Sequence, residues 1–166
     1  MTAYKFLSAD GKGVFSGFAW PLPNGAPGDW VAAEVDPCRS GVHACRARDL
    51  PYWLAPTLYE IELDGHVAET GMKLVAPRGR LVRRIETWNN EARAEYSQMC
   101  IARARELAAP GTELLGPWVP PAASAAGPAA IGYIAARIAE AIGGIGAHAD
   151  ERARQSAWLA ERLELA

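Results

Sequence analysis

Apolar and polar residues alternate with a period of two over much of residues 1–86, which is typical of strands with one buried face. The clearest run alternates apolar and acidic positions at Tyr59, Glu60, Ile61, Glu62 and Leu63. Shorter runs with the same character predict further strands at residues 4–8, 14–20, 42–45, 72–76 and 81–85. Asp-Gly pairs follow the first strand and residue 63, and such pairs favour tight turns between antiparallel neighbours. This part of the chain therefore predicts a mostly antiparallel sheet.

Two segments interrupt the strands. Asp49 is placed to cap a short helix over residues 50–54, with Pro51 in its first turn and Pro56 at its end. Residues 21–29, PLPNGAPGD, are too rich in Pro and Gly for a central strand and predict an exposed loop. That loop is either a plain connector or a lid beside a binding site, since positioned loops often carry binding groups.

From Thr87 onward the apolar period becomes helical. We expect Thr87 to cap a helix, because apolar residues follow at i+3 and i+4 spacing: Trp88, Ala92, Tyr96, Met99, Cys100, Ala104 and Leu107. Two more helices are expected after residue 128, the last one starting at Asp150. The predicted fold class is α+β, a mostly antiparallel sheet with one short helix followed by three C-terminal helices. Its predicted parts are residues 1–86 (β-rich domain), 87–109 (helix on the sheet), 110–128 (Pro/Ala/Gly-rich linker) and 129–166 (helical hairpin).

Composition and charge exclude several classes of function. The chain has 166 residues, half of them hydrophobic, and a formal net charge of -2, so no basic field would attract duplex nucleic acid. No apolar run reaches the roughly 18 residues that a membrane span needs. Three cysteines, an odd number, and no charged segment leading into an apolar one argue for the reducing cytoplasm. We therefore expect a cytoplasmic protein without a membrane segment.

The cysteines and histidines offer one metal-like pattern. Cys38, His43 and Cys45 are spaced so that a turn and one strand face could bring them together, as in zinc sites. A structural zinc site needs a fourth ligand, and no local spacing marks Cys100, His66 or His148 for that role. The competing interpretation is that the thiols are ordinary core residues. A second hypothesis makes Cys45 a nucleophile activated by His43.

Two charged groups are further candidates. Glu60 and Glu62 share a strand face, where one carboxylate could act as an acid or base with His43 as a catalytic partner; solvated surface glutamates are the alternative. Arg78 and Arg80 could bind one phosphate or carboxylate, or could instead protect an edge strand from pairing with another chain. The aromatic residues expected to wall and floor such a ligand site are Trp20 and Tyr59.

The motifs YKFL..DG.G.FSGFAW, C.SGVHAC...DL and LYEIELDG, with a strand that contains Lys73, resemble a family of bacterial and phage domains without assigned activity. This resemblance covers roughly residues 4–86. The order of these motifs is also similar, more distantly, to the middle of rifampin-type ADP-ribosyltransferases, which hold NAD in a cleft between two sheets. That resemblance implies NAD as a cofactor. It departs at Tyr4-Lys5, where those enzymes carry a His-Gly pair for the nicotinamide ribose.

Two functional hypotheses follow. The first is a small-ligand or nucleotide-handling bacterial enzyme of ADP-ribosyltransferase-like architecture. It requires residues 42–45 and 58–63 to run side by side, so that His43 and a carboxylate meet at the rim of one hollow. The second is a non-catalytic binding module that forms a homo-oligomer through residues 129–166, because an Ala-rich hairpin behind a Pro-rich linker resembles an interaction element.

Overall fold

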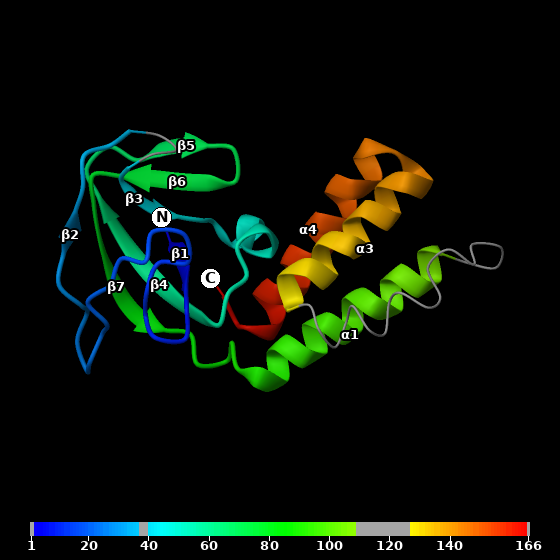
Figure 1. Ribbon diagram of the computed structural model, residues 1–166, viewed down its shortest axis with the longest axis horizontal. Coiled ribbons are helices and arrows are strands. Elements are labelled where there is room, and N and C mark those ends of the chain that lie inside the picture. The colour runs from blue at the N-terminus through cyan, green and yellow to red at the C-terminus, as the bar shows by residue number, and fades with distance from the viewer. Residues whose placement is uncertain (1, 37–39, 109–126, 166) are drawn as a thin grey trace.

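Two antiparallel sheets lie beside a group of helices in the computed structural model, which describes residues 2–36, 40–108 and 127–165 (Figure 1). The first sheet has the order β1-β4-β7-β2 and the second the order β3-β6-β5. The strands are β1 (Ala3–Leu7), β2 (Val31–Ala32), β3 (Val42–Ala44), β4 (Thr57–Asp64), β5 (Ala68–Thr70), β6 (Lys73–Ala76) and β7 (Arg78–Arg84). The helices are η1 (Ala47–Tyr52), α1 (Asn90–Leu107), α3 (Pro128–Gly143) and α4 (Ile145–Arg162).

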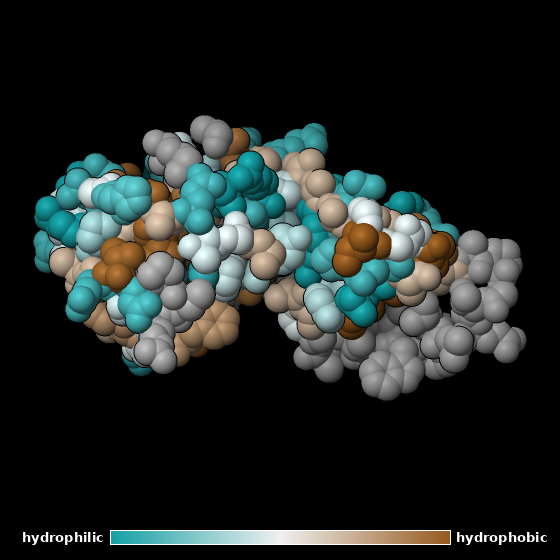
Figure 2. Space-filling view, turned by 90° about the horizontal axis from the view of Figure 1, so that it is seen from above, coloured by the Kyte–Doolittle hydropathy of each residue, from teal (hydrophilic) through white to brown (hydrophobic). Residues whose placement is uncertain are grey.

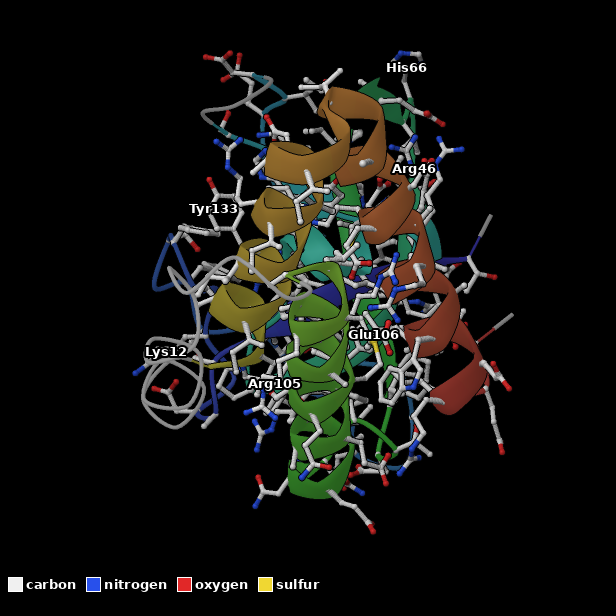
Figure 3. The ribbon with its side chains drawn as sticks, turned by 90° about the vertical axis from the view of Figure 1, so that its right-hand side faces the viewer. Lys12, Arg46, His66, Arg105, Glu106 and Tyr133 are labelled. Carbon is white, nitrogen blue, oxygen red and sulfur yellow. The ribbon has the colours of Figure 1, made fainter. Side chains whose placement is uncertain are left out.

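Strand β1 is buried on both faces, which explains why it is apolar at nearly every position. One face packs with the helices, and this core includes Tyr4, Phe6, Leu58, Trp88 and Leu159. Side chains from both sheets form the other core, which contains Leu7, Trp20, Val42, Ile61, Leu74 and Leu81. Figure 3 looks onto α1, α3 and α4, which lie in front of the sheets from that side. The predicted α+β class is confirmed.

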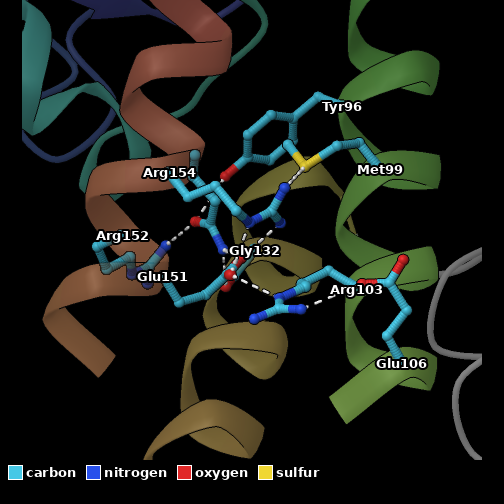
Figure 4. A network of polar contacts seen from close by, with 9 residues as sticks. Tyr96, Met99, Arg103, Glu106, Gly132, Glu151, Arg152 and Arg154 are labelled. Carbon is cyan, nitrogen blue, oxygen red and sulfur yellow. Dashed lines mark hydrogen bonds and ion pairs between the residues drawn. The ribbon is translucent and has the colours of Figure 1, made fainter. Parts of the chain in front are cut away.

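Buried polar side chains join the three long helices (Figure 4). The Glu151 carboxylate accepts hydrogen bonds from Arg154 and Gln155, at 2.8 Å in each case, and an Arg103 nitrogen lies 3.6 Å away. Gln155 in turn accepts a hydrogen bond from the Tyr96 hydroxyl at 2.9 Å and donates one to the Gly132 carbonyl at 3.0 Å. Burial raises the pKa of Glu151, but these hydrogen bonds and the arginine charges outweigh it, so the pKa lies below its usual value. The carboxylate therefore stays charged inside the helical layer.

Residues 14–20 do not form the predicted strand. Val14, Phe15 and Ser16 lie in a tight turn that the Gly17 N–H closes by donating to the Gly13 carbonyl at 2.8 Å. Gly17 has a φ of 66°, a conformation that favours glycine and ends the extended backbone there. The segment instead makes an isolated bridge between Lys12 and Ala19, with backbone hydrogen bonds from the Gly13 N–H to the Phe18 carbonyl at 2.9 Å and from the Trp20 N–H to the Gly11 carbonyl at 3.1 Å. Val14, Phe15 and Phe18 are therefore exposed rather than packed in a sheet, while Trp20 at the end of the segment is buried.

Three predicted helix starts are also wrong. Asn89, not Thr87, caps α1, because its side chain accepts a hydrogen bond from the Ala92 N–H at 3.0 Å. Helix α4 begins at Ile145, directly after Gly144, so Asp150 lies inside it. Asp49 lies inside η1, where its carboxylate accepts a hydrogen bond from Arg46 Nε at 2.5 Å instead of capping the backbone.

Some expectations fall outside the described residues. The linker prediction concerns residues 110–128, of which the structure describes only Gly127, the N-cap of α3, and Pro128, its first residue. Cys38 also lies outside them. Seen from above, hydrophobic residues occur in small separate groups on an otherwise mixed surface (Figure 2). None of the described helices combines the length and apolar character that crossing a bilayer requires.

Candidate functional site

A cavity of about 480 Å³ opens where the two sheets separate. Strands β1 and β3 touch through one bridge, in which Tyr4 and Cys45 exchange two backbone hydrogen bonds of 2.8 Å. Beyond that bridge no strand pairing continues between them among the described residues. The cavity lies along this gap and is lined by Tyr4, Lys5, Phe6, Gly13, Val14, Phe15, Ser16, His43, Ala44, Cys45, Trp53 and Lys73. Its walls therefore come from both sheets, the turn after β1 and the residue after η1.

Two aromatic side chains meet at the cavity. Phe15 belongs to the turn that replaces the predicted strand, and 88% of its surface is exposed. Its ring and the Trp53 ring meet at nearly a right angle, with 6.4 Å between the centroids. Trp53 is fixed in turn, because its Nε1 donates a hydrogen bond to the Met72 carbonyl at 2.8 Å. An aromatic ring this exposed beside a cavity presents a face on which a planar ligand group can stack.

The titratable lining of the cavity includes two lysines and, in the described part of the chain, no carboxylate. Lys5 and Lys73 line it together with His43, and no Asp or Glu is found among the described residues of its lining. The nearby carboxylates of Asp49 and Glu69 both pair with Arg46. Lys73 makes no ion pair with any residue in the described part of the chain. The cavity thus has a positive potential that favours an anion.

Lys5 bridges the gap between the sheets. Its Nζ donates a hydrogen bond to the His43 carbonyl at 2.6 Å and lies 4.6 Å from the centre of the Trp20 ring. Burial lowers the pKa of the Lys5 ammonium from 10.5 to about 8. A substantial fraction of this amine is therefore unprotonated at mildly alkaline pH.

The imidazole of His43 is neutral at neutral pH. Burial, followed by the charges of Lys73 and Lys5, lowers its pKa below the usual value. Its Nε2 is buried and has no hydrogen-bond partner among the described residues. His43 forms part of the cavity wall, and its backbone carbonyl positions the Lys5 ammonium.

Neither cysteine hypothesis gains support from this geometry. Burial and the charge of Asp49 raise the pKa of the Cys45 thiol to about 12, so it stays protonated and is a poor nucleophile. Within the described ranges, no group of three or more His, Cys, Asp or Glu side chains is arranged to hold a metal ion. The proposed set of Cys38, His43 and Cys45 includes Cys38, which those ranges do not cover.

The expected meeting of His43 with Glu60 or Glu62 does not occur. Strand β3 pairs with β6, while β4 lies in the other sheet between β1 and β7. Neither glutamate lines the cavity. Glu60 accepts a hydrogen bond from Arg83 and Glu62 one from Arg80, both at 2.8 Å across the β4–β7 pair. The physical reason is register, which places acidic residues of β4 opposite basic residues of β7.

The four predicted ligand-binding residues do not line the cavity. Trp20 and Tyr59 are buried in the core between the sheets. Trp20 contacts the ammonium of Lys5, which lines the cavity, but does not line the cavity itself. The guanidinium groups of Arg78 and Arg80 both lie over the Trp30 ring, at 4.9 and 4.7 Å from its centre. Arg78 also pairs with Asp64 at 3.1 Å, so both arginines have acidic and aromatic partners. None of the four lines the cavity.

Sequence reasoning missed Lys5, Lys73, Phe15 and Trp53 as site residues. A signal was present for Lys5, because a lysine in the middle of the apolar segment YKFL has no solvated strand face to occupy. No comparable signal marks Phe15, since an aromatic residue in an alternating segment is normally a core residue. Comparisons with models of protein families, with curated proteins and with solved structures found no match.

Proposed function

We propose that this chain binds a small anionic ligand of the nucleotide class in the cavity between β1 and β3. The observation that carries the proposal is the lining, in which two lysines face the cavity and no carboxylate is found among its described residues. An anion entering this space is drawn by two positive charges, and neither of them has a carboxylate partner there. Lys side chains bind phosphate groups in this way, as point charges.

The remaining features of the cavity favour a nucleotide over inorganic phosphate. Its volume of about 480 Å³ lies within the range of small-molecule sites, roughly 300–1,000 Å³. Phe15 and Trp53 offer aromatic surface on which a base can stack, an interaction worth about 1–3 kcal/mol. A phosphate near the lysines and a base at the aromatic rings would use both kinds of surface.

The ADP-ribosyltransferase-like hypothesis makes NAD the first dinucleotide to test. Its support is a cavity placed between two sheets, with Lys5 at the position where those enzymes carry their His-Gly pair. ADP-ribosyl transfer also needs a group that stabilises the positive charge developing on the ribose, and carboxylates usually serve. Glu60 and Glu62 lie outside the cavity, so ligand binding is the activity that the cavity supports best.

Isothermal titration calorimetry tests the proposal with AMP, ATP, NAD, adenosine and pyrophosphate. We expect the phosphate-bearing nucleotides to bind more tightly than adenosine, with an affinity that falls as salt is raised. Lys73→Met should weaken AMP and ATP about tenfold, which corresponds to roughly 1.4 kcal/mol, and leave adenosine unchanged. Phe15→Ala should weaken nucleotides and adenosine alike.

Two matched variants control for general effects. Lys12 is an exposed lysine paired with Asp10 at 2.6 Å, and Phe18 is a partly exposed aromatic residue that contacts Trp20; neither lines the cavity. Lys12→Met and Phe18→Ala should bind all ligands as the wild type does. The proposal is wrong if no phosphate-bearing ligand binds, or if Lys12→Met weakens binding as much as Lys73→Met.

Assembly through residues 129–166 remains a second candidate function, favoured by apolar side chains exposed at the helices. Tyr133 and Ile142 of α3 and Ile145 of α4 are each more than half exposed. Light scattering coupled to size-exclusion chromatography measures the mass of the full chain directly. A dimer that becomes monomeric on Ile142→Lys and Ile145→Lys substitution would support this function, and a monomeric wild type would remove it.

A further inference from the structure

We propose that Lys5 is a nucleophilic amine that forms an imine with an aldehyde-bearing anionic ligand held in the cavity. The proposal deepens the function given above and rests on it, because the ligand must first enter the cavity as an anion. The Lys5 side chain crosses the gap between the two sheets. Anion binding requires only the charge of Lys5, whereas imine formation requires its nitrogen as a nucleophile. The ligand class is a small aldehyde that carries a phosphate or another anionic group.

The surroundings of Lys5 set it apart from the other two lysines of the chain. Lys12 is exposed and paired with Asp10, whose hydrogen bond and charge raise the pKa of Lys12 above its usual value. Lys73 lines the cavity beside a neutral His43. Lys5 is half-buried, and its Nζ is positioned by the His43 carbonyl and the Trp20 ring rather than by a carboxylate.

Both position and protonation matter for an attacking amine. Lys5 and His43 both line the cavity, and the hydrogen bond from Nζ to the His43 carbonyl holds the amine in place before a ligand binds. Burial lowers the pKa of Lys5 to about 8, which leaves an unprotonated fraction with a free electron pair near neutral pH. Lys73 lines the same cavity and supplies a positive charge for the anionic end of the ligand.

The reaction is a condensation that needs no oxidant or reductant. The electron pair of Lys5 Nζ attacks the carbonyl carbon, and the carbonyl oxygen takes up a proton to give a carbinolamine. The carbinolamine then loses its hydroxyl group and a proton from nitrogen as water, which leaves a C=N double bond. Amine and aldehyde thus give imine and water. The imine nitrogen, when protonated, keeps the positive charge that Lys5 had and can still donate to the His43 carbonyl.

Pyridoxal 5′-phosphate is a suitable probe, because it combines an aldehyde, a phosphate and an aromatic ring. The full-length wild-type chain is incubated with it at pH 8, the imine is reduced with sodium borohydride, and the labelled lysines are identified by peptide mass spectrometry. We expect Lys5 to be labelled at least about tenfold faster than Lys12, since a far larger fraction of Lys5 is unprotonated at that pH. Labelling should saturate with probe concentration and be slowed by AMP.

Lys12 serves as an internal control, so the result does not depend on a variant that folds. Labelling of Lys12 or Lys73 at the rate of Lys5 or faster would overturn the proposal. Lys5→Met should in addition lose the imine absorbance, while Lys12→Met retains it.

Pyridoxine 5′-phosphate separates the two proposals, because it has the ring and phosphate of the probe but no aldehyde. If it binds by calorimetry and pyridoxal 5′-phosphate leaves Lys5 unlabelled, the imine is refuted and anion binding stands. If neither it nor any nucleotide binds, and labelling of Lys5 does not saturate, both proposals fail. Saturable labelling of Lys5 that pyridoxine 5′-phosphate competes away supports both.

Discussion

Lys5 is a charged residue whose surroundings disfavour its charge. Lys5 projects from β1 beside the buried Trp20 ring, and in the part of the chain that the structure describes its ammonium has one hydrogen-bond acceptor, the His43 carbonyl. Burial therefore makes the charged form of Lys5 less stable in the folded protein than in the unfolded chain. A ligand anion would offset this cost, which is a physical reason for a cavity of this kind to bind one.

The pKa of Lys5 predicts how stability changes with pH. The folded pKa of about 8 lies below the ordinary 10.5, so between these values the unfolded chain binds the proton and the folded protein does not. Wild-type stability should accordingly gain a contribution as pH rises from about 8 to 10.5, of up to about 3 kcal/mol. Lys5→Met should lack this gain, and urea unfolding at pH 7, 9 and 10 measures it.

Lys12→Met is the matched control for this measurement, because Lys12 is exposed and its pKa is raised rather than lowered. It should keep the wild-type rise above pH 8. Equal pH dependence in wild type and Lys5→Met would show that Lys5 is solvated and titrates normally.

At the scale of the elements, α3 packs closely against both of its helical neighbours at one glycine. Gly132 lies where α3 crosses α1, and its carbonyl accepts a hydrogen bond from the buried Gln155 of α4. A Cβ at this position would overlap the Tyr96 hydroxyl and lie 3.1 Å from Gln155 Oε1. The close approach of three helices therefore depends on the absence of a side chain at residue 132.

Gly132→Ala should destabilise the protein by about 1–3 kcal/mol, because the new methyl group displaces a buried hydrogen-bonded hydroxyl. Gly146→Ala in α4 is its counterpart, since nothing lies within 4 Å of the added Cβ and alanine favours the helix, for a gain of about 0.5 kcal/mol. Chemical denaturation of both variants measures the contrast.

A double variant tests the cause of this effect. Tyr96→Phe removes the hydroxyl that the methyl group would meet, so Gly132→Ala should cost less in that background than in the wild type. Equal costs in both backgrounds would mean that the clash is relieved in another way.

At the scale of the whole molecule, the C-terminal helices complete the core that the sheet begins. Ile131, Ile138 and Leu159 belong to the same buried cluster as Tyr4 and Trp88. Ser156 of α4 also donates a hydrogen bond to the Ala47 carbonyl of η1 at 2.9 Å, and Arg152 donates one to the Pro51 carbonyl. Helices and sheet thus share one hydrophobic interior.

Removing residues 127–166 should therefore unfold the remaining chain, since it would expose the apolar face formed by Tyr4, Phe6, Leu58 and Trp88. Circular dichroism and proton NMR of the truncated chain measure the loss of packing. Leu159→Ala, a milder change, should cost about 2–5 kcal/mol and keep a single unfolding transition. A well-dispersed NMR spectrum from the truncated chain would show instead that residues 2–108 fold independently, with the hairpin as an appendage.

The predictions from sequence succeeded where a pattern reports directly on burial. The alternation in β4 and the helical stripe of α1 were both recognised, because each reflects one buried face and neither depends on a distant partner. The predicted strand at residues 14–20 was wrong because most of its apolar side chains, Val14, Phe15 and Phe18, are exposed, and of this group only Trp20 is buried. The predicted helix starts were wrong because several polar residues near a helix end could each act as the cap, and only side-chain geometry decides which one does.

The sequence by itself determined the α+β class and which faces of β4 and α1 are buried, because local periodicity records the contact of each segment with water or core. Only the tertiary structure decided where a cavity forms, since it depends on β1 and β3, far apart in the chain, meeting at Tyr4 and Cys45 and then separating. That meeting placed Lys5 at the cavity with Lys73 of β6, and the separate β4–β7 pairing gave Glu60 and Glu62 arginine partners on β7. Strand order and register come from long-range packing, which no local pattern encodes.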